Sequence, residues 1–128
     1  MNIEIETFNL HLASSTTPAT QPTLVATPSA SGTPQLIARC PTCLVALYSH
    51  YGGNKVLLYV RAGTLGEGSR HRVKPDAHIF TDTKAEWVDL RSEVERGAKV
   101  FVRHYERGEV WSKGALERRE RVMEQMKT

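Results

Sequence analysis

The stretch Arg39-Cys40-Pro41-Thr42-Cys43 contains the only two cysteines of this 128-residue chain. Thiolates at Cys-x-x-Cys spacing can both face one point while the intervening residues turn the backbone, which is how half of a tetrahedral zinc site is built. A complete structural zinc site needs four ligands, so this stretch supplies half of one. We therefore predict zinc as a cofactor, with Cys40 and Cys43 as metal ligands.

Two other interpretations of the cysteine pair remain open. A redox pair of the thioredoxin type opens a helix after a strand, but the residues that follow here, 44–48, have the apolar character of a strand. The two thiols can also be buried residues without a chemical role. We rank the zinc half-site first, the inert thiols second and the redox pair third.

Apolar segments around the cysteines predict a mainly β fold. Residues 36–38 and 44–48 flank the cysteine turn and predict two strands joined at their tip. Residues 56–60 are continuously apolar, which predicts a strand buried on both faces. Alternating apolar residues in 3–12 and 100–105 predict two further strands.

Two other segments complete the predicted organisation. Four prolines in the Ser/Thr/Pro-rich residues 13–34 exclude a regular strand ladder or helix, which predicts a long exposed connection, and the polar residues 66–76 predict a second loop. Ser112 can cap a short C-terminal helix. We expect one domain over residues 1–119, with 120–128 as the end of that helix and a tail.

Charge and hydropathy limit the partners. The chain has 17 Lys and Arg and 14 Asp and Glu, a net charge of +3, and the two signs are interleaved after Arg39, so we expect a mixed, solvated surface and no nucleic acid partner. No apolar run is long enough to span a membrane, and the first residues lack the basic segment of a secretory signal. We expect a cytoplasmic, reducing location, which disfavours a disulfide.

The histidines and tryptophans are weaker candidates for a site. His78, beside an apolar segment, is a possible ligand or base, but a lone histidine there is more often a hydrogen-bonded packing residue. We expect His50 and His71 to be exposed, and Trp87 and Trp111 to pack in the core or line a pocket. We assign no catalytic residue.

Several local strings occur in the order seen in a known family. They are Pro-Ser-Ala-Ser-Gly at 28–32, Arg-Cys-Pro-Thr-Cys at 39–43, Val-Arg-Ala-Gly-Thr-Leu at 60–65, Pro-Asp-Ala-His-Ile-Phe-Thr at 75–81 with Lys84, Trp-Val-Asp-Leu at 87–90, Trp111, and Ala-Leu-Glu-Arg-Arg at 115–119. This ordered set resembles the glutathione-dependent formaldehyde-activating enzyme family, which also includes centromere protein V. The resemblance runs from about residue 3 to residue 119.

The resemblance implies a β-tent fold, built from small antiparallel sheets around zinc. It also implies a carbon–sulfur lyase or S-(hydroxymethyl)glutathione synthase, with glutathione or another small thiol adduct as partner. In the family pattern, a structural zinc site combines an early Cys-x-Cys with a later Cys-x-x-Cys, which Cys40 and Cys43 match. The catalytic zinc is held by a separate Cys-x-Cys-x-x-Cys.

This sequence departs from the family pattern at both cysteine motifs that precede the match. Neither the early Cys-x-Cys nor the catalytic Cys-x-Cys-x-x-Cys is present, so the chain resembles an N-terminally truncated member. Many members carry Gly after the second cysteine, whereas Leu44 stands here, as in a straight strand exit. We expect a zinc-binding domain without catalytic ligands; the alternative is a degenerate binding or structural module of the same fold.

Overall fold

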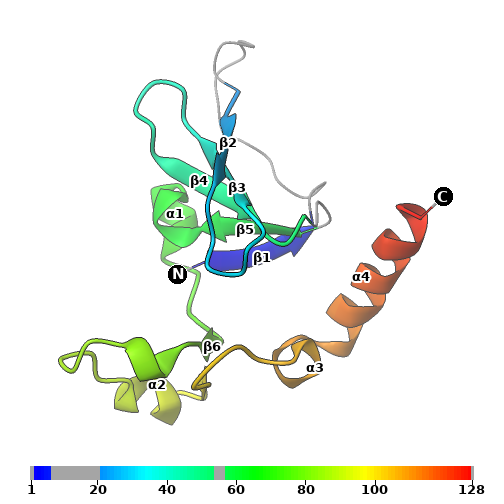
Figure 1. Cartoon of the computed structure of the whole chain (residues 1–128). Helices are drawn as coiled ribbons and strands as arrows, with labels where there is room; N and C mark the ends of the chain where they lie inside the picture. The colour runs from blue at the N-terminus through cyan, green and yellow to red at the C-terminus, as the bar shows by residue number, and fades with distance from the viewer. Residues whose placement is uncertain (1, 7–20, 54–56, 128) are drawn as a thin grey trace. The chain divides into compact units, whose positions relative to one another are not determined.

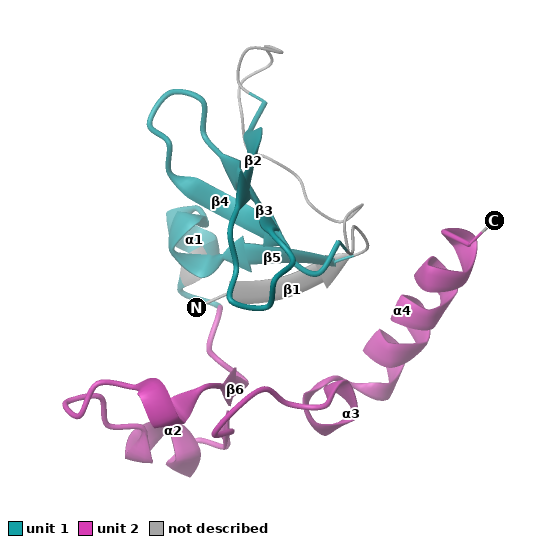
Figure 2. Cartoon of the chain, viewed as in Figure 1, with its two compact units in different colours: residues 1–72 teal, residues 73–128 magenta. Residues whose placement is uncertain are grey.

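The computed structural model describes residues 2–6, 21–53 and 57–127 (Figure 1). The chain divides into two compact units, Met1–Arg72 and Val73–Thr128 (Figure 2). The domain bounds expected from the sequence, 1–119 and 120–128, remain a prediction. Among the described residues, no helix combines the length and the apolar character needed to cross a membrane.

The first unit is built on an antiparallel sheet with the strand order β1-β5-β4-β3-β2 (Figure 1). The strands are β1 (Asn2–Glu6), β2 (Thr23–Thr27), β3 (Gln35–Arg39), β4 (Ala46–His50) and β5 (Leu57–Arg61). The predicted strand pair around the cysteines is confirmed as β3 and β4. The first predicted strand is confirmed over β1, and residues 7–12 lie outside the described part of the chain.

Both faces of this sheet carry buried side chains. Ile37 and Leu57 are buried on one face, and Ala38, Leu58 and Val60 are buried on the other. Alternate residues of one strand point to opposite faces, so the continuous apolar run in β5 is buried on both faces of the sheet, as predicted. Burying a leucine side chain stabilises the fold by about 2 kcal/mol.

A buried hydroxyl group connects two central strands of the sheet. Ser49 on β4 has no exposed surface, and its Oγ accepts a hydrogen bond of 2.9 Å from Nη2 of Arg61 on β5. Arg61 also donates from Nη1 to the carbonyl oxygen of Tyr59 at 3.3 Å. These bonds satisfy a polar group that would be costly to bury without a partner.

The prediction for residues 13–34 is wrong over Thr23–Thr27, which form the edge strand β2. Pro22 and Pro28 flank this strand and do not interrupt it, so every residue between them keeps its N–H group. Proline is tolerated beside edge strands for this reason. Residues 13–20 lie outside the described residues.

The predicted loop at 66–76 also holds regular structure. It contains the short helix α1 (Glu67–Arg70), which follows the 3-10 turn η3 (Ala62–Thr64). Glu67 lies in the first turn of α1, where a carboxylate interacts favourably with the N-terminal end of the helix dipole.

The second unit is mostly helices and short turns. Its elements are β6 (Ala77–His78), η4 (Thr81–Thr83), α2 (Arg91–Glu95), β7 (Lys99–Val100), α3 (Arg107–Val110) and α4 (Lys113–Gln125). The predicted C-terminal helix is confirmed as α4, and the Oγ of Ser112 accepts a hydrogen bond from the N–H of Ala115 at 3.2 Å. The described residues thus combine an antiparallel sheet with helices.

The strand predicted over residues 100–105 is wrong beyond Val100. β7 pairs with β6 in parallel over only two residues each. Phe80, which follows β6, has a φ of 53°, a left-handed conformation that bends the chain out of the extended form. Further backbone bonds, from Phe80 N to Arg103 O and from Thr81 N to Phe101 O, join the two segments without a regular ladder.

Candidate metal centre

The Cys40–Cys43 turn joins β3 to β4 in the first unit, and two backbone hydrogen bonds close it. The N–H of Cys40 donates to the carbonyl oxygen of Val45, and the N–H of Leu44 donates to that of Cys40, both at 3.0 Å. The register of β3 against β4 shifts between Ala38 and Arg39, just before the turn. The two cysteines are thereby held at the end of a paired hairpin.

Both cysteines are free, with Cys40 half-buried and Cys43 exposed. The backbone N–H of Cys43 first, and then that of Thr42, hold the pKa of Cys40 below its ordinary value. Hydrogen bonds to sulfur favour the thiolate, which is the form that binds metals. Both predicted ligands lie in this one turn between β3 and β4.

Leu44 does not continue into a straight strand, and that expectation is wrong. Its φ is 61°, in the left-handed region that a side chain such as leucine rarely adopts. This conformation changes the direction of the chain directly after Cys43, and the carbonyl oxygen of the next residue, Val45, accepts from the N–H of Cys40. Strained backbone of this kind persists where the surrounding structure holds it, and it clusters at functional sites.

Arg39 stabilises the same turn through a hydrogen bond, a role that we did not predict from the sequence. Its Nη1 donates to the carbonyl oxygen of Leu44 at 3.0 Å. This bond satisfies a carbonyl at the strained residue and attaches the positively charged guanidinium to the residue that follows Cys43. An arginine directly before the first cysteine is the only signal in the sequence that points to it.

The histidines do not complete a metal site in the described residues. His50 lies half-buried in β4, against the expectation of exposure, with Nδ1 3.1 Å from the carbonyl oxygen of Leu57. His71 follows α1 and is exposed, as expected. No group of three or more His, Cys, Asp and Glu side chains among the described residues is placed to hold a metal ion.

A second polar cluster lies in the second unit around His78. Its Nε2 is 2.9 Å from Oε2 of Glu93. Arg96 donates from Nη2 to the same Oε2 at 2.5 Å and from Nε to Oε1 of Glu93 at 3.1 Å. Arg96 first, and then His78, lower the pKa of Glu93 to about 2. Arg96 also donates to the carbonyl oxygen of Pro75 at 2.6 Å. His78 is thus the hydrogen-bonded packing residue that we favoured from the sequence.

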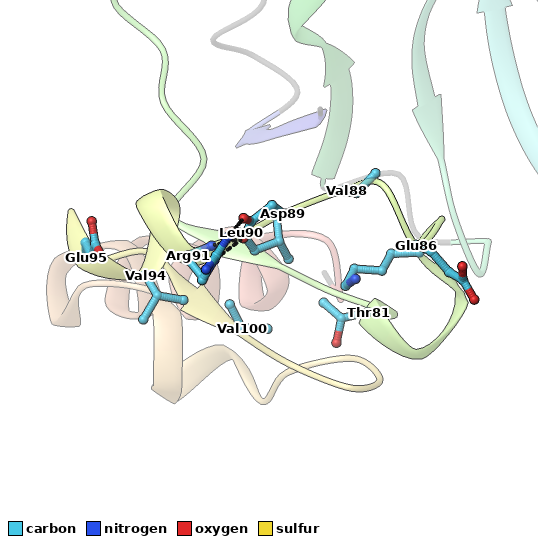
Figure 3. A pocket seen from close by; sticks show the side chains of 10 residues that line it. Thr81, Glu86, Val88, Asp89, Leu90, Arg91, Val94, Glu95 and Val100 are labelled. Atoms are coloured by element: carbon cyan, nitrogen blue, oxygen red, sulfur yellow. Dashed lines mark hydrogen bonds and ion pairs between the residues drawn. The ribbon is translucent and has the colours of Figure 1, made fainter.

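An open depression of about 750 Å³ lies in the second unit (Figure 3). Its apolar lining consists of Val88, Leu90, Val94 and Val100. Lys84 and Glu86 also line it, and so does the ion pair of Arg91 Nη2 with Asp89 Oδ2 at 2.5 Å. Its surface therefore offers both signs of charge around an apolar floor.

The expectation that Trp87 packs in the core or lines a pocket is wrong. Its side chain is 85% exposed, and it is absent from the lining of the depression formed by its neighbours. Trp87 lies in a turn closed by the bond from Val88 N to Ala85 O at 3.0 Å. Trp111 is half-buried, and the guanidinium of Arg107 lies 5.6 Å from the centre of its ring.

Comparison of the chain with protein-family models, with curated proteins and with solved structures finds no match.

Proposed function

We propose that this chain is a zinc-binding domain in which Cys40 and Cys43 are metal ligands with a structural role. The observation that carries the proposal is the turn itself. Two free thiols lie three residues apart in this turn, the pKa of Cys40 is lowered by neighbouring N–H groups, and Leu44 has a left-handed conformation directly after the pair. Two inert buried thiols would need none of these features, and Cys43 is exposed.

The donor set fits zinc. Thiolates are preferred zinc ligands, and the neighbouring N–H groups that lower the pKa of Cys40 favour its thiolate form. Zinc held by Cys40 and Cys43 would cross-link the end of β3 to the start of β4 and contribute directly to folding free energy. The redox interpretation is disfavoured because the segment after Cys43 leads into the strand β4 and not into a helix.

We further propose, on the strength of the sequence resemblance, that the domain is a β-tent of the glutathione-dependent formaldehyde-activating enzyme and centromere protein V type. The antiparallel hairpin around the cysteine turn supports this assignment. Members of that family are described as carbon–sulfur lyases or S-(hydroxymethyl)glutathione synthases, and such chemistry needs a second zinc with an open position. The two cysteines of this 128-residue chain are committed to one turn, so we propose a non-catalytic role for the chain as it stands.

A second candidate function is binding of glutathione or another small thiol adduct without chemistry. The depression in the second unit supports it, because its apolar floor and its groups of both charges suit a small zwitterionic peptide. Titration of labelled protein with glutathione, followed by NMR, tests this candidate. Shifts confined to residues 81–100 favour it, and a spectrum unchanged at millimolar glutathione excludes it.

The zinc proposal is tested by competition against a chromophoric chelator. A structural zinc site contributes about 12 kcal/mol over four ligands, or about 3 kcal/mol for each, so Cys40→Ser should weaken zinc binding by roughly 100-fold for each thiolate that the site loses. Thr42→Ser, in the same turn, leaves both sulfurs in place and should bind as the unmodified chain does. Equal zinc affinity with and without Cys40 would refute the proposal.

A further inference from the structure

The Cys40–Cys43 turn is half of a metal site. Structural zinc takes four protein ligands in a tetrahedral arrangement, and this turn offers two. Across residues 21–53 and 57–127, no third His, Cys, Asp or Glu joins the pair in a metal-binding group. A zinc ion held by this turn therefore needs further ligands from outside the described residues.

The turn is open to an approaching partner. Residues 41–45 are all exposed, and two of them are large and apolar, since Leu44 is 64% exposed and Val45 is 47% exposed. The strands behind the turn are paired with each other, so the tip is presented on a rigid support. These exposed apolar side chains and the incomplete ligand set are both accessible to a second molecule.

We propose that a second copy of this chain completes the site, so that one zinc ion is held by Cys40 and Cys43 of each of two copies. The inference rests on the proposed zinc-binding function and adds the source of the missing ligands. A two-fold axis through the metal places the same turn on both sides, as in an isologous interface. Leu44 and Val45 of one copy then lie where the equivalent residues of the other can cover them.

Charge favours a second copy over a partner of different chemistry. Zinc with four thiolates carries two net negative charges, which need nearby positive charge. Arg39 is fastened to Leu44 O at 3.0 Å beside the cysteines, and two copies bring two such guanidinium groups. The assembled centre is then electrically balanced by groups that the turn already positions.

The experiment measures mass and metal content together, on the full chain in a phosphine reductant that prevents disulfide-linked dimers. Sedimentation velocity with and without zinc gives the oligomeric state, and native mass spectrometry gives the number of zinc ions per assembly. The expected result is a monomer without zinc and a dimer holding one zinc per two chains. Cys43→Ser should remain monomeric with zinc, and Thr42→Ser should dimerise normally.

A second variant keeps the test valid if the cysteine variant does not fold. Val45→Asp leaves all sulfurs in place but adds a carboxylate from each copy beside a negatively charged centre. Its zinc-dependent dimer should dissociate at least tenfold more readily, whereas Val45→Thr should behave as the unmodified chain. Equal dimerisation by Val45→Asp and Val45→Thr would overturn the proposed interface.

The outcomes separate this inference from the function on which it rests. One zinc per monomer, with no dimer at any zinc concentration, overturns the shared site but leaves the zinc-binding function standing. No zinc bound above the level of Cys43→Ser overturns both. One zinc per two chains, lost together with the dimer in Cys43→Ser, supports both.

Discussion

The N–H of Leu44 donates to the carbonyl oxygen of Cys40 at 3.0 Å while Leu44 adopts a left-handed φ of 61°. The two features meet at one residue: the N–H of Leu44 closes the turn on Cys40, and its left-handed φ redirects the chain to Val45, whose carbonyl oxygen accepts from the N–H of Cys40. A left-handed φ is energetically unfavourable for leucine, so other interactions in the turn must stabilise it. The bonds of Cys40 N with Val45 O and of Arg39 with Leu44 O provide that support.

Replacing Leu44 by glycine should stabilise the first unit or leave it unchanged. The left-handed conformation destabilises a leucine by roughly 1–2 kcal/mol, and glycine relieves that strain. The greater conformational freedom of glycine in the unfolded chain offsets about 0.5–1 kcal/mol of the stabilisation. Val45→Gly is the matched control, since it carries the entropy cost without relieving a positive φ. Urea unfolding should rank Leu44→Gly above Val45→Gly, and the reverse order would contradict the strain argument.

Ser49→Ala should destabilise the sheet. It removes the acceptor of the 2.9 Å bond from Arg61 at a fully buried position, and losing a bond to a charged donor costs roughly 1–3 kcal/mol. Ser69→Ala, at an exposed position in α1, should change the unfolding free energy by less than about 0.5 kcal/mol. Equal effects of the two substitutions in chemical denaturation would mean that the buried bond contributes nothing.

The second unit should lose stability in acid through Glu93. The folded-state pKa of Glu93 is lowered from 4.5 to about 2, first by Arg96 and then by His78. A lowered pKa stabilises the folded form above pH 4.5, and this stabilisation disappears as the pH falls from 4.5 towards 2. Glu93→Gln should therefore flatten the pH dependence of thermal unfolding in that range. Glu95→Gln, at an exposed position of the same helix, should leave the slope as it was.

The 128-residue chain should show no catalytic activity towards formaldehyde and glutathione when zinc is supplied. Carbon–sulfur chemistry of the family type needs a metal with an open position and its own ligands, and a third cysteine to begin such a set is absent from the sequence. The measurement is turnover of S-(hydroxymethyl)glutathione by the purified chain. Turnover that disappears on chelation would contradict the prediction and would make His78 the first residue to replace.

Local sequence patterns correctly predicted those helices and strands whose formation depends on interactions between residues close in sequence. The paired strands beside the cysteines, the doubly buried β5 and the helix capped by Ser112 all follow from periodicity or capping. β2 was missed because the Ser/Thr/Pro-rich composition of residues 13–34 was taken to exclude a strand. The five residues of β2 contain no proline and lie at the edge of the sheet. A strand this short is stabilised by its neighbour β3 and not by its own pattern.

The parts of the site that could not be predicted depend on residue conformation or on partners distant in sequence. Leucine gives no sign of a left-handed φ, so the bend after Cys43 was invisible. Glu93 lies 15 residues from His78, and this separation in sequence does not predict the hydrogen bond between them. The exposure of Trp87 likewise depends on a turn that its neighbours form.

Cobalt(II) titration of the reduced chain tests the central claim most directly, because thiolate-to-cobalt charge-transfer absorption reports sulfur ligands and zinc then displaces the cobalt. We expect this absorption to develop to saturation for the unmodified chain and for Thr42→Ser, and to disappear when zinc is added. The Cys40→Ser/Cys43→Ser chain should develop none. Absence of charge-transfer absorption in the unmodified chain, at cobalt concentrations that saturate ordinary thiolate sites, would contradict the claim that Cys40 and Cys43 bind metal.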